Sequence, residues 1–206
     1  MALSPGERDY IDRQQGTSCE TCGANLRSIA LSDAIRNAVG TTRTLREFVC
    51  ADAARAMSIL EINEAGSLNS TLRLLPGHRL AVYPDVDMHS LPYPDDLFDL
   101  VVHSDTLEHV AHPVKALAEC RRVLKAGGWL CFTVPTVVGR LTRSRVGLAK
   151  SFHDNRETSD DFLVYTEFGA DMWTVVLEAE FAAVTVNAVE FPAALALSAR
   201  KQGRSG

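Results

Sequence analysis

An alternation of buried strands and helices constrains this chain more than any other feature of its sequence. The branched apolar run Phe98–His103 is typical of a central strand in a parallel sheet. A helix is expected over Pro113–Lys125, with proline at its first position and Gly127-Gly128 as its C-terminal stop. Trp129–Val134 then predicts the next buried strand. This order predicts an α/β fold with a mostly parallel, doubly wound sheet.

Shorter elements are expected around this centre. Helical spacing of apolar residues predicts helices over 26–39, 44–57, 68–75 and 171–180. Apolar runs predict strands over 58–63, 79–83, 184–189 and 195–199, of which the last two form an antiparallel C-terminal pair. Residues 1–18 show no clear period and predict a loosely held arm, whereas residues 136–170 are typical of a loop or lid.

The composition excludes several classes of protein. The chain has 206 residues, 46% of them hydrophobic, and no apolar run of the roughly 20 residues that a bilayer requires, so we expect one globular unit without membrane contact. A net charge of −5 argues against nucleic acid as a partner. The N-terminus has no apolar leader, and Cys120 and Cys131 stand in apolar segments, so a reducing cytoplasm is expected. Trp129 and Trp173 occupy apolar periodic positions and are expected in the core.

The N-terminal part, residues 1–57, contains the arm, two helices and a single Cys-x-x-Cys pair, and residues 58–206 hold the α/β domain. Cys19 and Cys22, followed by Gly23, have the spacing of half a zinc knuckle. Zinc needs four ligands, and no second pair exists, so we expect no metal here. A metal would require Cys50, a histidine or another subunit to complete the site.

Three ordered motifs carry a family resemblance. The run Leu91–Val102, which reads LPYPDDLFDLVV, precedes Leu107-Glu108-His109-Val110, and Arg122–Gly128 reads RVLKAGG. In these motifs the chain resembles the class I S-adenosylmethionine-dependent methyltransferases of the small-molecule type. The resemblance is dense over residues 87–135 and implies a Rossmann-like sheet with S-adenosylmethionine as cofactor.

The same resemblance implies where the methionine part of the cofactor lies. In the family, an acidic residue at the end of the first strand precedes a loop with three alternating glycines. Glu61 matches the acidic position, but Asn63, Ala65 and Ser67 stand where glycines are expected, and Gly66 falls between the last two. Because side chains restrict the backbone there, the loop is degenerate, and loss of the cofactor stays open.

The resemblance also assigns the adenosine side. Only 34 residues, 64–97, separate the first strand from Phe98, so one strand–helix unit is expected to be shortened or lost. Asp85 is then the best match to the acid that binds the ribose, with Tyr83 second. Asp87 and Met88 match the pair that faces adenine. Ser104 and Asp105 are expected to line the cofactor and substrate pocket.

Two histidines are candidates for acid–base catalysis, because a hydroxyl or ammonium acceptor must lose a proton before methylation. His109 lies in the Leu-Glu-His motif and His153 in the lid segment, while Tyr165 and Glu167 are candidates for shaping the acceptor site. For both histidines, a purely structural role stays open. The basic run of Arg140, Arg143, Arg145 and Lys150 is either a solvated face or a site for an anionic acceptor.

Two functions follow from these features. The first is methyl transfer from S-adenosylmethionine to a small-molecule or glycoconjugate acceptor, and the alternative is a catalytically inactive methyltransferase-like module that binds a partner. A nicotinamide dinucleotide is a poor candidate cofactor, because the chain has no Gly-x-Gly-x-x-Gly. Whether the chain forms a homodimer stays open.

Overall fold

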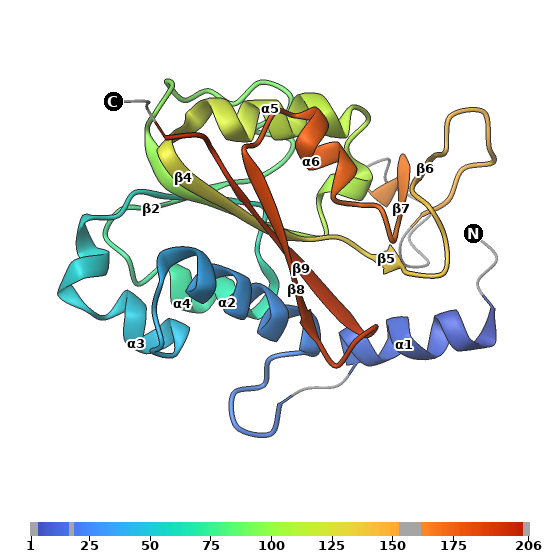
Figure 1. Ribbon diagram of the computed structural model, residues 1–206, viewed down its shortest axis with the longest axis horizontal. Helices are drawn as coiled ribbons and strands as arrows, with labels where there is room; N and C mark the ends of the chain where they lie inside the picture. Colours follow the sequence, from blue (N-terminus) through green and yellow to red (C-terminus); the bar gives the residue numbers. More distant parts are fainter. Residues whose placement is uncertain (1–3, 17–18, 153–161, 204–206) are drawn as a thin grey trace.

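A single mixed sheet organises the described part of the chain (Figure 1), which in this computed structural model comprises residues 4–16, 19–152 and 162–203. Its strand order is β2-β1-β3-β4-β9-β8. The strands are β1 (Ile59–Ile62), β2 (His78–Ala81), β3 (Phe98–Ser104), β4 (Leu124–Thr133), β8 (Ala183–Val189) and β9 (Ala194–Arg200). The first four strands pair in parallel, and β9 pairs antiparallel with both β4 and β8. The predicted fold class, including the antiparallel C-terminal pair, is confirmed.

Helices cover both faces of this sheet. Figure 1 shows α5 (Pro113–Val123) and α6 (Thr174–Glu178) on one side and α2 (Leu26–Val39) on the other. The helix α2 packs against β9, β8 and β4, so the N-terminal part of the chain contributes to the same core as the sheet. On the face of α2 also lie α3 (Leu45–Val49) and α4 (Asn69–Leu72).

The central strands are buried on both faces, as the sequence predicts for a parallel sheet. In β3, Val101 packs into the apolar cluster under α5, whereas Leu100 and Val102 pack into the cluster under α2. Cys120 on α5 and Cys131 on β4 are both fully buried, so each thiol serves as a small apolar side chain.

The edge of the sheet beside β1 shows the predicted shortening. Between β1 and β3 the chain forms only the short helices η2 (Gly66–Leu68) and α4 and the strand β2. β2 is the outermost strand of the sheet in the described residues. The chain then runs from β2 to β3 through residues 82–97, which form no further helix or strand.

The N-terminus differs from the sequence prediction. Residues Pro5–Gly16 form the helix α1, so the prediction of a loose arm is wrong for this segment. Ser4 and Glu7 cap the helix, since the Glu7 amide donates to Ser4 Oγ and the Ser4 amide donates to Glu7 Oε2. Glu7 also pairs with Arg140 at 2.8 Å. Tertiary contacts therefore stabilise a helix whose apolar periodicity is weak.

Three further regions depart from the predictions. Residues 44–57 form two short helices, α3 and η1 (Asp52–Ala56), instead of one. The helix α5 ends at Val123 and not at the glycine pair, because Leu124 already pairs with Phe98 as the first residue of β4. The segment predicted as a loop or lid contains a second sheet of β5 (Thr136–Val137), β7 (Thr166–Gly169) and β6 (Arg143–Ser144).

The two tryptophans also behave differently. Trp129 is half-buried and packs beneath the Arg200 guanidinium, whose Cζ lies 5.4 Å from the ring centroid. Trp173 is 40% exposed, so its predicted place in the core is wrong.

In the described ranges, no helix combines the length and the apolar character needed to cross a bilayer.

Candidate functional site

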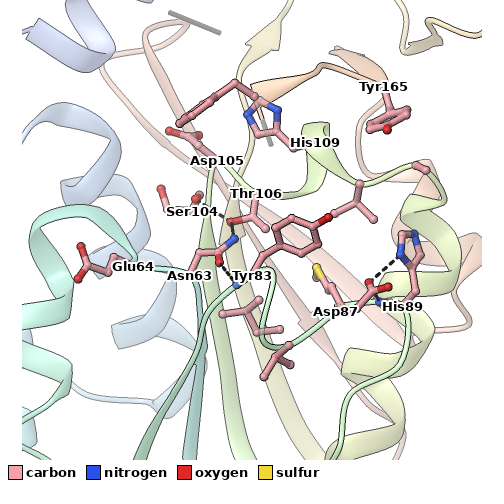
Figure 2. A pocket seen from close by; sticks show the side chains of 16 residues that line it. Asn63, Glu64, Tyr83, Asp87, His89, Ser104, Asp105, Thr106, His109 and Tyr165 are labelled. Atoms are coloured by element: carbon pink, nitrogen blue, oxygen red, sulfur yellow. Dashed lines mark hydrogen bonds and ion pairs between the residues drawn. The ribbon is translucent and has the colours of Figure 1, made fainter. Parts of the chain in front are cut away.

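The carboxyl ends of three parallel strands meet in one place. Ile62 at the end of β1 is in register with Ala81 of β2 and with His103 of β3. The segments that follow these strands therefore emerge side by side, and they enclose a cavity of about 520 Å³ (Figure 2). The lining residues are Ile62, Asn63, Glu64, Tyr83, Val86, Asp87, Met88, His89, Ser104, Asp105, Thr106, His109, Val110, Ala111, Phe162 and Tyr165.

Asn63 replaces the first glycine expected in the loop after β1. Its φ of 53° lies in the left-handed region, which asparagine tolerates better than most residues with a side chain. The side-chain amide crosses the crevice: Oδ1 accepts from the Tyr83 amide at 3.1 Å, and Nδ2 donates to Thr106 Oγ1 at 3.4 Å (Figure 2). The loop thus keeps its turn and gains a polar bridge between three strand ends.

Glu61 lies beneath this loop and does not line the cavity. Its side chain is fully buried, and the carboxylate accepts hydrogen bonds from the Ala65 amide at 2.7 Å and from Asn69 Nδ2 at 3.0 Å. His78 Nε2 lies 2.6 Å from the same carboxylate. Glu61 therefore anchors the loop to α4 and β2, which differs from the cofactor contact that the resemblance implies.

The other loop residues leave the cavity open. Glu64 lines the rim, and Figure 2 shows its side chain directed away from Tyr83 and Asp87. Gly66 lies outside the lining and has a φ of 56°. A Cβ on Gly66 would stand 3.2 Å from Ser28 Oγ, so this glycine permits close approach of α2 to the loop.

The segment after β2 forms the opposite wall. Asp87 Oδ1 accepts from the backbone amide of His89 and from His89 Nδ1, both at 2.8 Å, and the first of these bonds holds the pKa of Asp87 below its usual range. His89 Nε2 in turn accepts from the His112 amide at 3.2 Å. Met88 is buried and lines the cavity beside Asp87. The pair expected to face adenine is therefore held in the wall.

The expected ribose acid is placed differently. Asp85 is exposed and is not among the lining residues, whereas Tyr83, the second choice, lines the cavity. The third strand end supplies Ser104 and Asp105, both in the lining as expected. Ser104 Oγ lies 2.7 Å from Thr133 Oγ1 on the neighbouring strand, so its hydroxyl also joins β3 to β4.

His109 belongs to the short helix η3 (Leu107–His109) and also lines the cavity. Its Nδ1 lies 3.0 Å from the Leu163 carbonyl, which only accepts, so Nδ1 carries the proton and the lone pair is on Nε2. Burial lowers the pKa of His109, although the Leu163 carbonyl acts in the opposite direction. Tyr165 lies in the same wall (Figure 2).

Charged groups that the sequence reading missed lie behind this wall. Arg27, in the first turn of α2, is 7% exposed and forms an ion pair with Asp105. Burial lowers the pKa of Arg27 to about 10. Glu108 is also buried, and burial raises its pKa to about 7, while the charge of Arg27 acts in the opposite direction. The signal in the sequence is an arginine on the apolar side of a helix.

A second missed residue is His103, which lies in β3 beneath the site. It is fully buried and stacks on Phe132 with 4.7 Å between the ring centroids. Burial lowers the pKa of His103 to about 3, so the ring is neutral at physiological pH.

The basic run after β4 lies outside the cavity lining. Arg140 pairs with Glu7, and Arg143 and Arg145 both pair with Glu167. Glu167 therefore secures β6 against β7 and is absent from the lining. Each of these three guanidinium groups therefore forms an ion pair that joins two segments of the fold.

The remaining sequence candidates lie elsewhere. Cys19 and Cys22 are unpaired thiols; the Cys22 amide is the main cause that lowers the pKa of Cys19. Over the described ranges, no three His, Cys, Asp or Glu side chains are grouped to hold a metal. His153 falls outside the described residues.

The cavity fits an adenosyl cofactor in size and chemistry. Its volume lies within the roughly 300–1,000 Å³ typical of small-molecule sites. Asp87 offers a carboxylate oxygen at one end. At the other end lies Asp105 (Figure 2), whose buried Oδ1 has no hydrogen-bond partner among the described residues, and neither has the buried Nε of Arg27, which contacts Asp105 from outside the lining. These atoms suit a ligand that carries donors and acceptors at both ends.

Comparison with known proteins agrees with this geometry. Residues 22–132, just over half of the chain, match a family described as a methyltransferase domain. A protein encoded in a transposon of Streptomyces fradiae is 36% identical over 100 residues, which cover 48% of this chain and 29% of that protein. UbiE, a ubiquinone/menaquinone biosynthesis C-methyltransferase of Bordetella avium, is 38% identical over 72 residues, which cover 35% of this chain and 28% of that enzyme. The chain thus matches less than a third of the length of these relatives.

A solved structure supports the fold. The CurJ carbon methyltransferase superposes with a TM-score of 0.50 at 17% identity, covering 74% of this chain and 50% of that one. At this level of identity, the similarity concerns the fold alone.

Proposed function

Because this chain belongs to the class I S-adenosylmethionine-dependent methyltransferases, we propose that it transfers a methyl group to the hydroxyl or amine of a small-molecule or glycoconjugate acceptor. The observation that carries this proposal is the cavity at the carboxyl edge of β1, β2 and β3, with His109 in its wall. When bound, S-adenosylmethionine supplies an electrophilic methyl group on a sulfonium. The protein then has to align the acceptor and exclude water.

His109 is the proposed base. With Nδ1–H donated to the Leu163 carbonyl, the lone pair of the neutral ring is on Nε2, which lies 3.6 Å from Glu108 Oε1, and burial lowers the pKa of the ring. Nε2 takes the proton of the acceptor as the acceptor atom forms its bond to the methyl carbon. A bound cofactor would supply the methyl group and leave as the neutral thioether.

The charge of the lining supports a neutral or cationic acceptor. Glu64, Asp87 and Asp105 line the cavity, and none of the described lining residues is Lys or Arg. An acceptor with a phosphate or carboxylate would therefore find no cationic side chain in the described lining itself.

A homodimer stays a separate prediction. Sedimentation velocity at several protein concentrations would measure it.

The binding of S-adenosylhomocysteine, the demethylated product, tests the cofactor part of the proposal. Calorimetric titration of the wild-type chain is expected to give a Kd of about 100 µM or tighter. Asp87→Ala is expected to weaken binding about tenfold, because it removes an acceptor for the adenine amino group. Asp85→Ala, on the same segment outside the lining, is the matched control; a loss there would return the ribose contact to Asp85.

One observation favours the inactive alternative. The Asn63 amide spans the ends of β1, β2 and β3, where a cofactor would pass over the loop. If the amide stays in this place, the chain is a binding module that retains the fold without the cofactor. No heat with S-adenosylhomocysteine at about 1 mM would favour this alternative and contradict the enzyme proposal.

A further inference from the structure

The loop after β1 offers few free polar groups to a charged ligand. The Ala65 amide donates to Glu61 Oε1, and the Glu61 carboxylate also holds Asn69 and His78. Both ends of the Asn63 amide are engaged as well. The charged end of a bound cofactor must therefore find its partners elsewhere in the cavity.

The loop after β3 offers such partners. Asp105 follows β3 directly, has a φ of 47° and lines the cavity, where Figure 2 shows it beside Ser104. Its carboxylate forms an ion pair with the Arg27 guanidinium, whose Nη2 also donates to Gln14 Oε1 at 3.4 Å. The pair thus joins the N-terminal helices α1 and α2 to the edge of the cavity.

Both members of this pair keep a polar atom without a partner. Arg27 Nε and Asp105 Oδ1 are buried and have no hydrogen bond to any described residue. Side-chain exposure is 9% for Arg27 and 26% for Asp105. Buried polar atoms are costly when unsatisfied, and in native proteins a ligand, an ion or water commonly completes them.

We propose that the Arg27–Asp105 pair recognises the zwitterionic α-amino acid end of the cofactor. The α-carboxylate accepts from the Arg27 guanidinium, and the α-ammonium donates to Asp105. This zwitterion presents one anion and one cation on a single carbon, which complements a guanidinium and a carboxylate already in contact. The inference rests on the proposed function, because it concerns the ligand of the same cavity.

The arrangement also accounts for the position of Arg27. None of the described lining residues is Lys or Arg; Arg27 lies outside the lining and reaches the cavity through its ion pair with the lining residue Asp105. A nearby second carboxylate, Glu108, contributes to the negative field that keeps Arg27 charged despite its burial. A guanidinium in this environment is a strong partner for a carboxylate.

Two ligands separate this role from a structural one. S-adenosylhomocysteine carries the amino acid end, whereas 5′-methylthioadenosine has the same adenosine and thioether without it. Calorimetric Kd values for both are measured with the wild-type chain, with Arg27→Lys and with the double variant Arg27→Met/Asp105→Asn. The double variant removes both charges of the ion pair together, so that neither partner is left as a buried charge without the other.

The double variant is expected to weaken S-adenosylhomocysteine binding about tenfold or more, while the Kd for 5′-methylthioadenosine stays within about twofold. Arg27→Lys is expected to retain part of the preference for S-adenosylhomocysteine. Arg36→Met, which removes a guanidinium from the same helix, is the matched control and leaves both Kd values unchanged.

The remaining outcomes contradict the inference. Equal weakening of both ligands would mean that the pair only supports the fold, and unchanged binding of both would mean that the amino acid end lies elsewhere. A wild-type chain that binds 5′-methylthioadenosine but not S-adenosylhomocysteine overturns this inference and keeps the adenosine pocket. Binding of neither ligand contradicts the proposed function itself, and this inference with it.

Discussion

The loops after β1 and β3 leave the sheet side by side but differ in how far the hydrogen-bonding capacity of their polar groups is satisfied within the protein. After β1, the Glu61 carboxylate is shared by Ala65, Asn69 and His78, all within 3.0 Å. After β3, Asp105 meets Arg27, and each of the two side chains keeps a buried atom without a partner. A polar group that is satisfied within the protein stabilises the fold, whereas one left unsatisfied at a cavity is available to a ligand.

The largest change in the free energy of unfolding is expected when the hydrogen-bonded carboxylate of Glu61 is removed. Glu61→Ala leaves the buried Ala65 amide, the half-buried Asn69 amide and His78 without their acceptor and is expected to lower the free energy of unfolding by about 3 kcal/mol. Urea unfolding followed by circular dichroism measures this change. The double variant Arg27→Met/Asp105→Asn is expected to change it by less than about 1 kcal/mol, because both charges leave together. A larger loss in the double variant than in Glu61→Ala would reverse the comparison.

A pH series tests the charges behind the β3 loop. Burial raises the pKa of Glu108 from 4.5 to about 7, so the folded state binds more protons than the unfolded state between these values. The contribution of Glu108 to stability is therefore full below about pH 4.5 and is lost as the pH rises through about 7, by up to about 3 kcal/mol.

The free energy of unfolding, measured in urea at pH 5, 6, 7 and 8, checks this slope. Glu108→Gln carries no titrating carboxyl and is expected to flatten the fall between pH 5 and 8. An identical slope in the wild type and in the variant would show that other groups cause it.

Restoring a glycine tests the bridge across the crevice. Asn63→Gly removes the amide that joins Tyr83 to Thr106 and suits the left-handed φ of 53°. We expect S-adenosylhomocysteine to bind about five- to tenfold more tightly, because the side chain no longer crosses the cavity. Calorimetric Kd values check this expectation. Weaker binding would instead assign the Asn63 amide a direct contact with the ligand.

The smallest effect is expected at Glu64. Its side chain is exposed at the rim, so Glu64→Gln should change the free energy of unfolding by less than about 0.5 kcal/mol. It removes one negative charge near the carboxylate end of the ligand and is expected to tighten S-adenosylhomocysteine binding by about twofold at low salt. Repeating the titration at high salt should abolish the difference, since an exposed charge is screened.

The sheet was predictable because its signals are local. The runs Phe98–His103 and Trp129–Val134 carry their burial in their own composition, and Pro113 marks a helix start by chemistry alone. The helix α1 was not predictable in this way, because its stability depends on Glu7 reaching Arg140. Trp173 is the opposite case, in which a local signal gave a wrong prediction. Its helical spacing predicted a place in the core, but its side chain is 40% exposed.

The candidate site was predictable in part for the same reason. Asp87, Met88, Ser104, Asp105 and His109 line the cavity because they stand at fixed distances from strands that the sequence already indicates. Asp85 lies outside the lining, because the shortened connection after β2 leaves its side chain exposed.

The sequence by itself determined the family, the succession of strands and helices along the chain and the edge of the sheet at which a ligand binds, since each depends on residues close together in the chain. Only the tertiary structure decided which charges meet there. Arg27 and Asp105 belong to segments far apart in the sequence, and neither position shows that its side chain will be buried against the other. Ion pairing depends on distance and dielectric environment, and both arise only when α2 packs over the sheet.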